Sequence, residues 1–130
     1  MSSVFAKIIQ GEIPCYKITE NHTCIAFLDI FPIKEGHVLV VPKKEINHWS
    51  DLDADTLQSV MLLSQQIANA IKKTFSCERV GVVVAGFDVP HCHVHLIPSD
   101  KMADLDFSNP KLKISSQRFQ EIASLIAQNL

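Results

Sequence analysis

The stretch His91-Cys92-His93-Val94-His95-Leu96-Ile97 places three histidines at alternate positions of an otherwise apolar run. Successive side chains of a β-strand point to opposite faces of the sheet, and the chain advances about 3.3 Å per residue. The run therefore predicts a strand over His91–Ile97, ended by Pro98, with the three imidazoles on one face. The intervening side chains then point into the core.

Three imidazoles on one face allow three interpretations. They can be ordinary half-buried histidines with hydrogen-bond partners. They can bind a metal ion, because histidines spaced HxH on a strand present zinc ligands, and Asp29, Asp88 or Asp100 could orient those ligands. They can also surround a phosphate, with a neutral imidazole as the nucleophile near pH 7. The spacing does not decide between metal and phosphate.

The N-terminal part of the chain predicts a helix followed by three strands. Val4–Ile9 carries apolar residues at helical spacing, and Gly11 is suited to end a helix there. A turn is expected at Asn21-His22. The expected strands are Cys15–Thr19, Cys24–Leu28 and Val38–Val41, the last one stopped by Pro42.

The remainder of the chain predicts two helices and the last two strands. From Asp53 the apolar period becomes helical, and the mostly valine run Val80–Ala85 predicts a fourth, central strand. A last helix is expected from about Ser116. The apolar face of the long helix is expected to hold Leu57, Val60, Met61, Ser64, Ile67, Ala68 and Ile71. We predict an α+β fold: a five-stranded antiparallel sheet with a long helix and flanking N- and C-terminal helices.

Size and composition favour one domain over residues 1–130. The chain is 47% apolar and has a net charge of −2, with two isolated basic pairs, Lys43-Lys44 and Lys72-Lys73, so we expect no nucleic-acid partner. Neither a signal peptide nor a membrane span is readable. The four cysteines have no CxxC spacing, so we expect reduced thiols and a cytoplasmic location.

Several segments together resemble the histidine triad (HIT) superfamily. The alternating run at His91–Ile97 matches the family signature His-φ-His-φ-His-φ-φ, where φ is apolar. The segment from Phe5 to Pro14 resembles the family's opening, and Ala26–Ile30 and Gly36–Lys43 resemble its second and third strands. The chain is most similar to short bacterial proteins of the Hint-like branch.

The resemblance implies a mechanism in which the central histidine attacks the α-phosphorus of a nucleotide. His93 would then carry a nucleotidyl group that water later removes. His91 and His95, if protonated, would stabilise charge on the phosphoryl oxygens, and His37 would support the triad from a neighbouring strand. The resemblance also implies a homodimer.

Nucleotide-binding residues are implied by the same resemblance. Asp29 matches the family's ribose-binding acid, a role that suits a carboxylate because it accepts hydrogen bonds from two adjacent hydroxyls. The positions that match the lining of the base pocket are Val4, Phe5, Ile8, Ile13, Phe27 and Leu39.

The segment Ala85-Gly86-Phe87-Asp88-Val89-Pro90 departs from the family pattern. Many relatives have an Asn and a Gly-Gln-Ser-like run here, whose polar groups contact phosphate. Phe87 stands where Gln is common, and Asp88 stands where Ser or Thr is frequent, so a carboxylate would lie near the phosphate.

A structural zinc ion, which some relatives hold through paired N-terminal cysteines, is not expected here. Ala6 and the missing CxxC argue against it, and Glu45 replaces a histidine found in some relatives. We expect no metal and no cofactor.

The leading expectation is a nucleotide hydrolase or nucleotidyl transferase that acts at the α-phosphate of purine nucleoside phosphoramidates or related nucleotides. A dinucleoside polyphosphate hydrolase and a non-catalytic nucleotide-binding protein are the alternatives. A metallohydrolase, in which the histidines bind a metal ion, is a further alternative.

Overall fold

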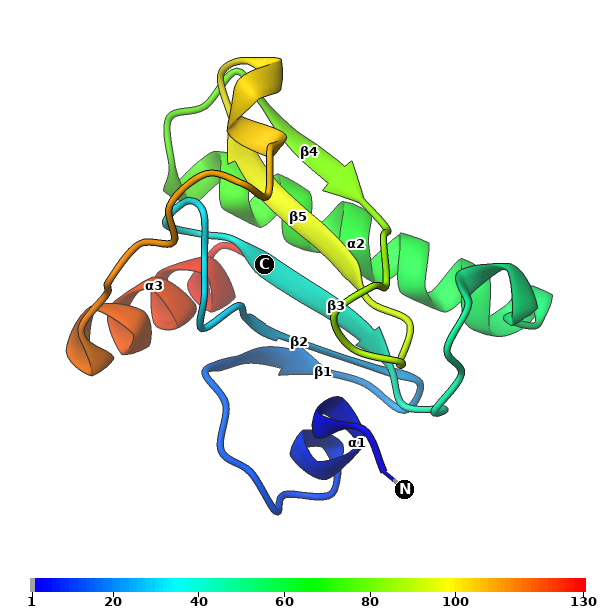
Figure 1. Ribbon diagram of the computed structural model, residues 1–130. Coiled ribbons are helices and arrows are strands. Elements are labelled where there is room, and N and C mark those ends of the chain that lie inside the picture. The colour runs from blue at the N-terminus through cyan, green and yellow to red at the C-terminus, as the bar shows by residue number, and fades with distance from the viewer. Residues whose placement is uncertain (1) are drawn as a thin grey trace.

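The computed structural model describes residues 2–130 as one antiparallel sheet with helices on both faces (Figure 1). The sheet has five strands in the order β1-β2-β3-β5-β4, and every neighbouring pair is antiparallel. The strands are β1 Lys17–Glu20, β2 Cys24–Leu28, β3 Val38–Pro42, β4 Arg79–Val83 and β5 Val94–Ser99. The helices are α1 Val4–Ile9, α2 Ala54–Thr74 and α3 Ser116–Gln128, with short 3₁₀ turns at Trp49–Asp51 and Met102–Leu105. The predicted fold class is confirmed.

The two faces of the sheet carry separate apolar cores. Helices α2 and α3 cover one face, where residues such as Ile67, Ile122 and Val40 are fully buried. Helix α1 lies on the opposite face, where Phe5 packs with Phe27 and neighbouring apolar side chains of β2 and β3. The first core is the larger and stabilises the fold, while the second holds α1 against the strands.

The helix starts follow local capping chemistry. Ser3, Asp53 and Ser115 are the N-caps of α1, α2 and α3, and each side chain accepts a hydrogen bond from a backbone N–H of the first turn. Helix α1 is followed by Gly11 at φ +80°, a conformation that glycine adopts without a Cβ clash.

Strand β4 is not central, which corrects the prediction from the Val80–Ala85 run. It lies at an edge of the sheet, and Val82 and Val84 are 51% and 37% exposed. Valine enrichment indicates a strand but not its place in the sheet order.

Strand β5 also differs from the predicted His91–Ile97. It begins at Val94, because the preceding backbone bonds to loops instead: the His91 N–H donates to the Val89 carbonyl and the Cys92 N–H to the Ile46 carbonyl. The strand continues through Pro98, where β4 is its only neighbour, and a proline is tolerated there.

Smaller differences concern β1 and the buried face of α2. Strand β1 starts at Lys17, two residues later than predicted. Met61 is 43% exposed, whereas Leu63 and Ala70, which the predicted face left out, are buried. The apolar face of α2 is therefore rotated slightly relative to the expected one.

Candidate active site

The three histidines keep their alternation even though β5 begins only at Val94. The His93 and His95 rings lie 4.9 Å apart between centroids. Phe5 of α1 contacts both His91 and His93, with centroid distances of 6.0 and 4.9 Å. Val94, between the last two histidines, packs in the core on the opposite face. The imidazoles therefore gather on the α1 side of the sheet.

The hydrogen bonding of His93 fixes its tautomer. Its Nδ1 lies 2.7 Å from the His91 carbonyl oxygen, and a carbonyl oxygen only accepts, so Nδ1 carries the proton. In the neutral ring Nε2 then keeps a lone pair. His93 is 1% exposed, and its Nε2 is buried without a hydrogen-bond partner among residues 2–130. An unpaired buried nitrogen is costly in a purely structural role, and this one is available for chemistry.

His91 has both ring nitrogens engaged. Nε2–H donates to the Pro42 carbonyl at 2.8 Å, and Nδ1 accepts from the Ser3 hydroxyl at 2.7 Å. The Ser3 oxygen in turn accepts from the Ala6 N–H, and the Ser3 N–H donates to the Glu45 carboxylate. This network links α1 to the end of β3, and it leaves His91 no ring nitrogen for a phosphoryl oxygen in this conformation.

His37 and His95 form an ordered donor chain. The Ile33 N–H donates to His37 Nδ1 at 3.2 Å, so His37 is protonated on Nε2 and donates to His95 Nδ1 at 2.9 Å. His95 then carries its own proton on Nε2. Burial, with smaller effects from neighbouring charged groups, lowers the pKa of both His37 and His95 to about 4. Both rings are therefore neutral at pH 7 in the free protein, unlike the protonated His95 considered from the sequence.

Asp29 lies beside this pair. One of its carboxylate oxygens accepts from the Phe31 N–H at 2.8 Å, and the other lies 3.5 Å from His37 Nε2. Its side chain is 17% exposed. The carboxylate thus keeps lone pairs at the rim of the histidine cluster, where a hydroxyl donor can reach them.

Two groups of side chains bring possible metal-ligating atoms within 4.8 Å of one another. They are Asp29 with His37 and His95, and Asp88 with His93 and His95. His95 belongs to both groups, yet its Nδ1 accepts from His37 and its Nε2 carries the proton. A metal ligand needs a free imidazole lone pair, so the hydrogen bonding argues against either group as a resident metal site.

Asp88, on the loop before the triad, lies next to His93, the candidate nucleophile. The Asp88 Oδ1 lies 3.2 Å from His93 Nε2, while the Asp88 side chain is 65% exposed. Phe87 beside it is 99% exposed. A cavity of about 200 Å³ reaches His93 between this loop and the segment that contains Asn47 and His48. Asn47 and His48 were not expected near the triad from the sequence.

Comparison with known proteins agrees with this geometry. A family model described as the HIT domain matches residues 10–102. This chain belongs to the HIT family. A crystal structure of a HIT-like protein from Bartonella henselae superimposes with a TM-score of 0.86 at 33% identity, covering 99% of this chain and 96% of that one.

Two sequence relatives of this HIT protein differ in how they are named. An uncharacterized HIT-like protein of Mycoplasma genitalium is 44% identical over 102 residues, which is 75% of this chain and 72% of the relative. An adenosine 5′-monophosphoramidase of Schizosaccharomyces pombe is 30% identical over 132 residues, which is 100% of this chain and 99% of the relative.

No helix within residues 2–130 has the length and apolar character needed to cross a membrane.

The apolar residues assigned to the base pocket of this HIT protein lie in different surroundings. Phe5, Phe27 and Leu39 are buried together on the α1 face, and Ile8 packs against them. Val4 on α1 is 42% exposed.

Some residues around the triad could not be assigned from sequence. Phe107 lies in the segment between β5 and α3, which has no periodic pattern, and its ring covers His95 at 4.8 Å. Lys111 donates to the Phe107 carbonyl at 2.7 Å and lies over the Phe107 ring. Ser3 carried a recognisable signal, since a serine directly before an apolar helix is a common N-cap.

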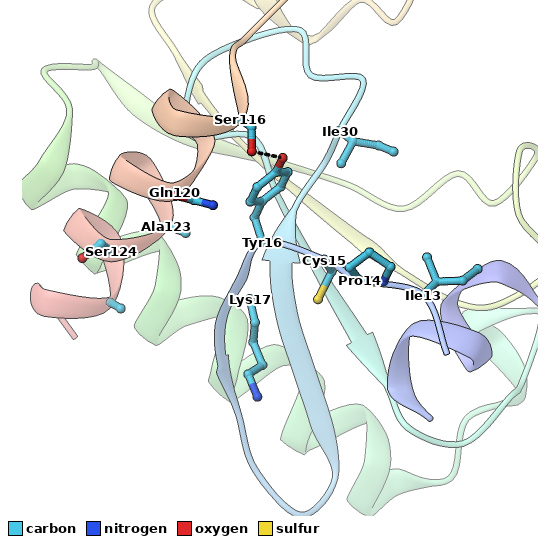
Figure 2. Close-up of a pocket in the computed structure, with 11 residues that line it drawn as sticks. Ile13, Pro14, Cys15, Tyr16, Lys17, Ile30, Ser116, Gln120, Ala123 and Ser124 are labelled. Carbon is cyan, nitrogen blue, oxygen red and sulfur yellow. Dashed lines mark hydrogen bonds between the residues drawn. The ribbon is translucent and has the colours of Figure 1, made fainter. Parts of the chain in front are cut away.

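A cavity of about 800 Å³ lies apart from the triad. Figure 2 shows it between β1 and α3, with Ile13, Cys15 and Tyr16 on one side and the polar residues of α3 on the other. The Tyr16 hydroxyl donates to Ser116 across it. Ile13 therefore lines this cavity rather than the histidine cluster.

Proposed function

We propose that this protein hydrolyses purine nucleoside phosphoramidates through a nucleotidyl group carried on His93. The observation that carries the proposal is the buried His93 Nε2, which has no hydrogen-bond partner within residues 2–130 and keeps its lone pair because Nδ1–H donates to the His91 carbonyl. The relative from Schizosaccharomyces pombe, which aligns over the whole chain, is named as an adenosine 5′-monophosphoramidase and supports the same chemistry.

The reaction proceeds in two displacements. The His93 Nε2 lone pair attacks the α-phosphorus, the P–N bond to the leaving amine breaks, and the amine departs with the bonding pair and takes up a proton. Water then attacks the nucleotidyl-His93, loses a proton, and releases the nucleoside monophosphate. The His93–phosphorus bond breaks in this step and Nε2 regains its lone pair.

The neighbouring residues supply position and hydrogen bonds. His95 Nε2–H is oriented by His37 and donates to a phosphoryl oxygen or to the leaving group. His91 is a positioning residue, because its carbonyl sets the His93 tautomer while its ring is held by Ser3 and Pro42. Its ring makes no contact with phosphate in this assignment.

The nucleoside is bound by one carboxylate and the apolar face of α1. Asp29 accepts from the ribose hydroxyls through the lone pairs it keeps beside His37. Val4 and Ile8 contact the base, backed by the buried cluster of Phe5, Phe27 and Leu39.

The protein is also proposed to be a homodimer. The edge strand β4 leaves backbone hydrogen-bonding groups unpaired, and an edge with exposed apolar side chains readily pairs with another chain. The β4 face, defined by Trp49, Met61, Val82 and Val84, is apolar, with exposed fractions of 55, 43, 51 and 37%. A cavity of about 410 Å³ lies among these residues. A second copy related by a twofold axis would cover this face with the same residues of its own.

The decisive test is turnover of an adenosine 5′-phosphoramidate by the purified protein. We expect hydrolysis that persists in excess EDTA, because no metal takes part, and a loss of at least about a thousandfold in His93→Ala, because the nucleophile is gone. His22→Ala, at an exposed histidine in the turn between β1 and β2, is the matched control and should keep most of the activity.

Three results would contradict the proposal. Activity abolished by EDTA and restored by Zn²⁺ would support a metallohydrolase. Binding of AMP without turnover of any nucleotide amide, ester or anhydride would support a binding protein. Turnover restricted to dinucleoside polyphosphates would support a dinucleoside polyphosphate hydrolase instead.

A further inference from the structure

We propose that the Asp88 carboxylate is a charge filter at the nucleophile, which favours nucleotides with a neutral leaving group over those whose leaving group carries negative charge. The inference rests on the proposed function and names the substrate class of that site. It makes Asp88 a specificity-determining residue.

The position of Asp88 carries the argument. Its Oδ1 lies 3.2 Å from His93 Nε2, a separation at which the reacting atoms of an attack complex are found. The carboxylate therefore occupies the space that a phosphoryl group must enter. The His93 side chain is fully buried, and its Nε2 has no hydrogen-bond partner within residues 2–130. Substrate has to displace the carboxylate before it reaches Nε2.

The loop allows this displacement but limits its range. Asp88 is 65% exposed, and Gly86 has φ +85° with no atom within 4 Å of the place where a Cβ would be. On the C-terminal side of Asp88 the backbone is held in place, because Val89 packs against the apolar core beneath α1. The Val89 carbonyl also accepts from the His91 N–H at 2.8 Å. The carboxylate can lift away from Nε2, yet it stays close to the bound phosphates.

The neighbouring imidazoles His37 and His95 do not offset this charge. His37 and His95 are neutral at pH 7, and Asp29 adds a second carboxylate on the far side of His95. Two like charges about 6 Å apart in a partly solvated site repel enough to lower affinity by about tenfold. A dinucleoside polyphosphate places several extra charges beyond the α-phosphate, whereas a phosphoramidate places an amine there.

The test compares two substrates in three proteins. The substrates are adenosine 5′-monophosphomorpholidate, with a neutral leaving amine, and diadenosine triphosphate, with an anionic one. We expect Asp88→Asn to raise the ratio of kcat/KM for the triphosphate to that for the morpholidate by about tenfold or more. Glu121→Gln removes a carboxylate from α3 on the opposite face, and it should leave the ratio unchanged.

A binding measurement separates the filter from the proposed reaction. In the His93→Ala background, which cannot react, the affinity for ADP relative to AMP should rise about tenfold when Asp88→Asn is added. A ratio that stays constant in both experiments would overturn the charge filter while leaving the phosphoramidase proposal intact. A shift in binding without any turnover by the unmodified protein would support the filter and overturn the reaction.

Discussion

At the scale of single residues, the hydrogen bonds of four histidines divide their roles. His93 keeps one free lone pair, His91 keeps none, and His37 orients His95. The alternation alone does not distinguish the three triad positions, and in the sequence only the family resemblance assigns the nucleophile to His93. Tautomers depend on which carbonyl or N–H each ring meets, and those partners, Pro42 and Ile33 among them, come from other segments of the chain.

The buried His37 and His95 predict a pH-dependent stability. Their pKa values of about 4 lie below the ordinary value near 6.5, so between pH 7 and 5 the unfolded chain binds protons that the folded one does not. The free energy of unfolding should fall by about 2 kcal/mol for each ring over this range. Urea unfolding at pH 7 and pH 5 measures the fall.

Matched variants attribute this pH dependence to the buried pair. His37→Gln removes one of the two buried rings and should reduce the fall in unfolding free energy, whereas His22→Gln, at an exposed turn, should not. Equal pH dependence in both variants would show that other groups are responsible.

At the scale of elements, the sequence pattern predicts that a helix or strand forms better than it predicts where that element lies in the fold. Helix α1 and strand β2 have the predicted bounds, because their apolar spacing and flanking turn residues agree. The valines of β4 predict a central strand, although Val82 and Val84 are exposed at the sheet edge.

The homodimer proposal is tested at this edge. Val82→Glu places a charge in the β4 face, so we expect a protein of one chain mass by light scattering, whereas the unmodified protein should show twice that mass. Leu125→Glu changes an exposed leucine on α3 outside that face and should leave the dimer intact. A monomeric unmodified protein at micromolar concentration would contradict the proposal.

At the scale of the whole molecule, the site is assembled from segments far apart in the chain. Ser3 and Phe5 precede the sheet, Asp29 and His37 flank a loop after β2, and Phe107 arrives after β5. The family resemblance located the histidines and Asp29, since these stand in motifs. It also placed the Asp88 carboxylate near the phosphate, but it could not locate Phe107, since loop geometry leaves no periodic signal.

The claim on which the rest depends is covalent chemistry at His93. The most direct measurement is rapid-quench mass spectrometry with an adenosine 5′-phosphoramidate, worked up under alkaline conditions that preserve phosphorus–nitrogen bonds. We expect an adenylyl group on the peptide that contains His93, absent in His93→Ala and formed no more slowly than steady-state turnover. Turnover without any adduct, or an adduct on a different residue, would contradict the assignment of His93 as the nucleophile.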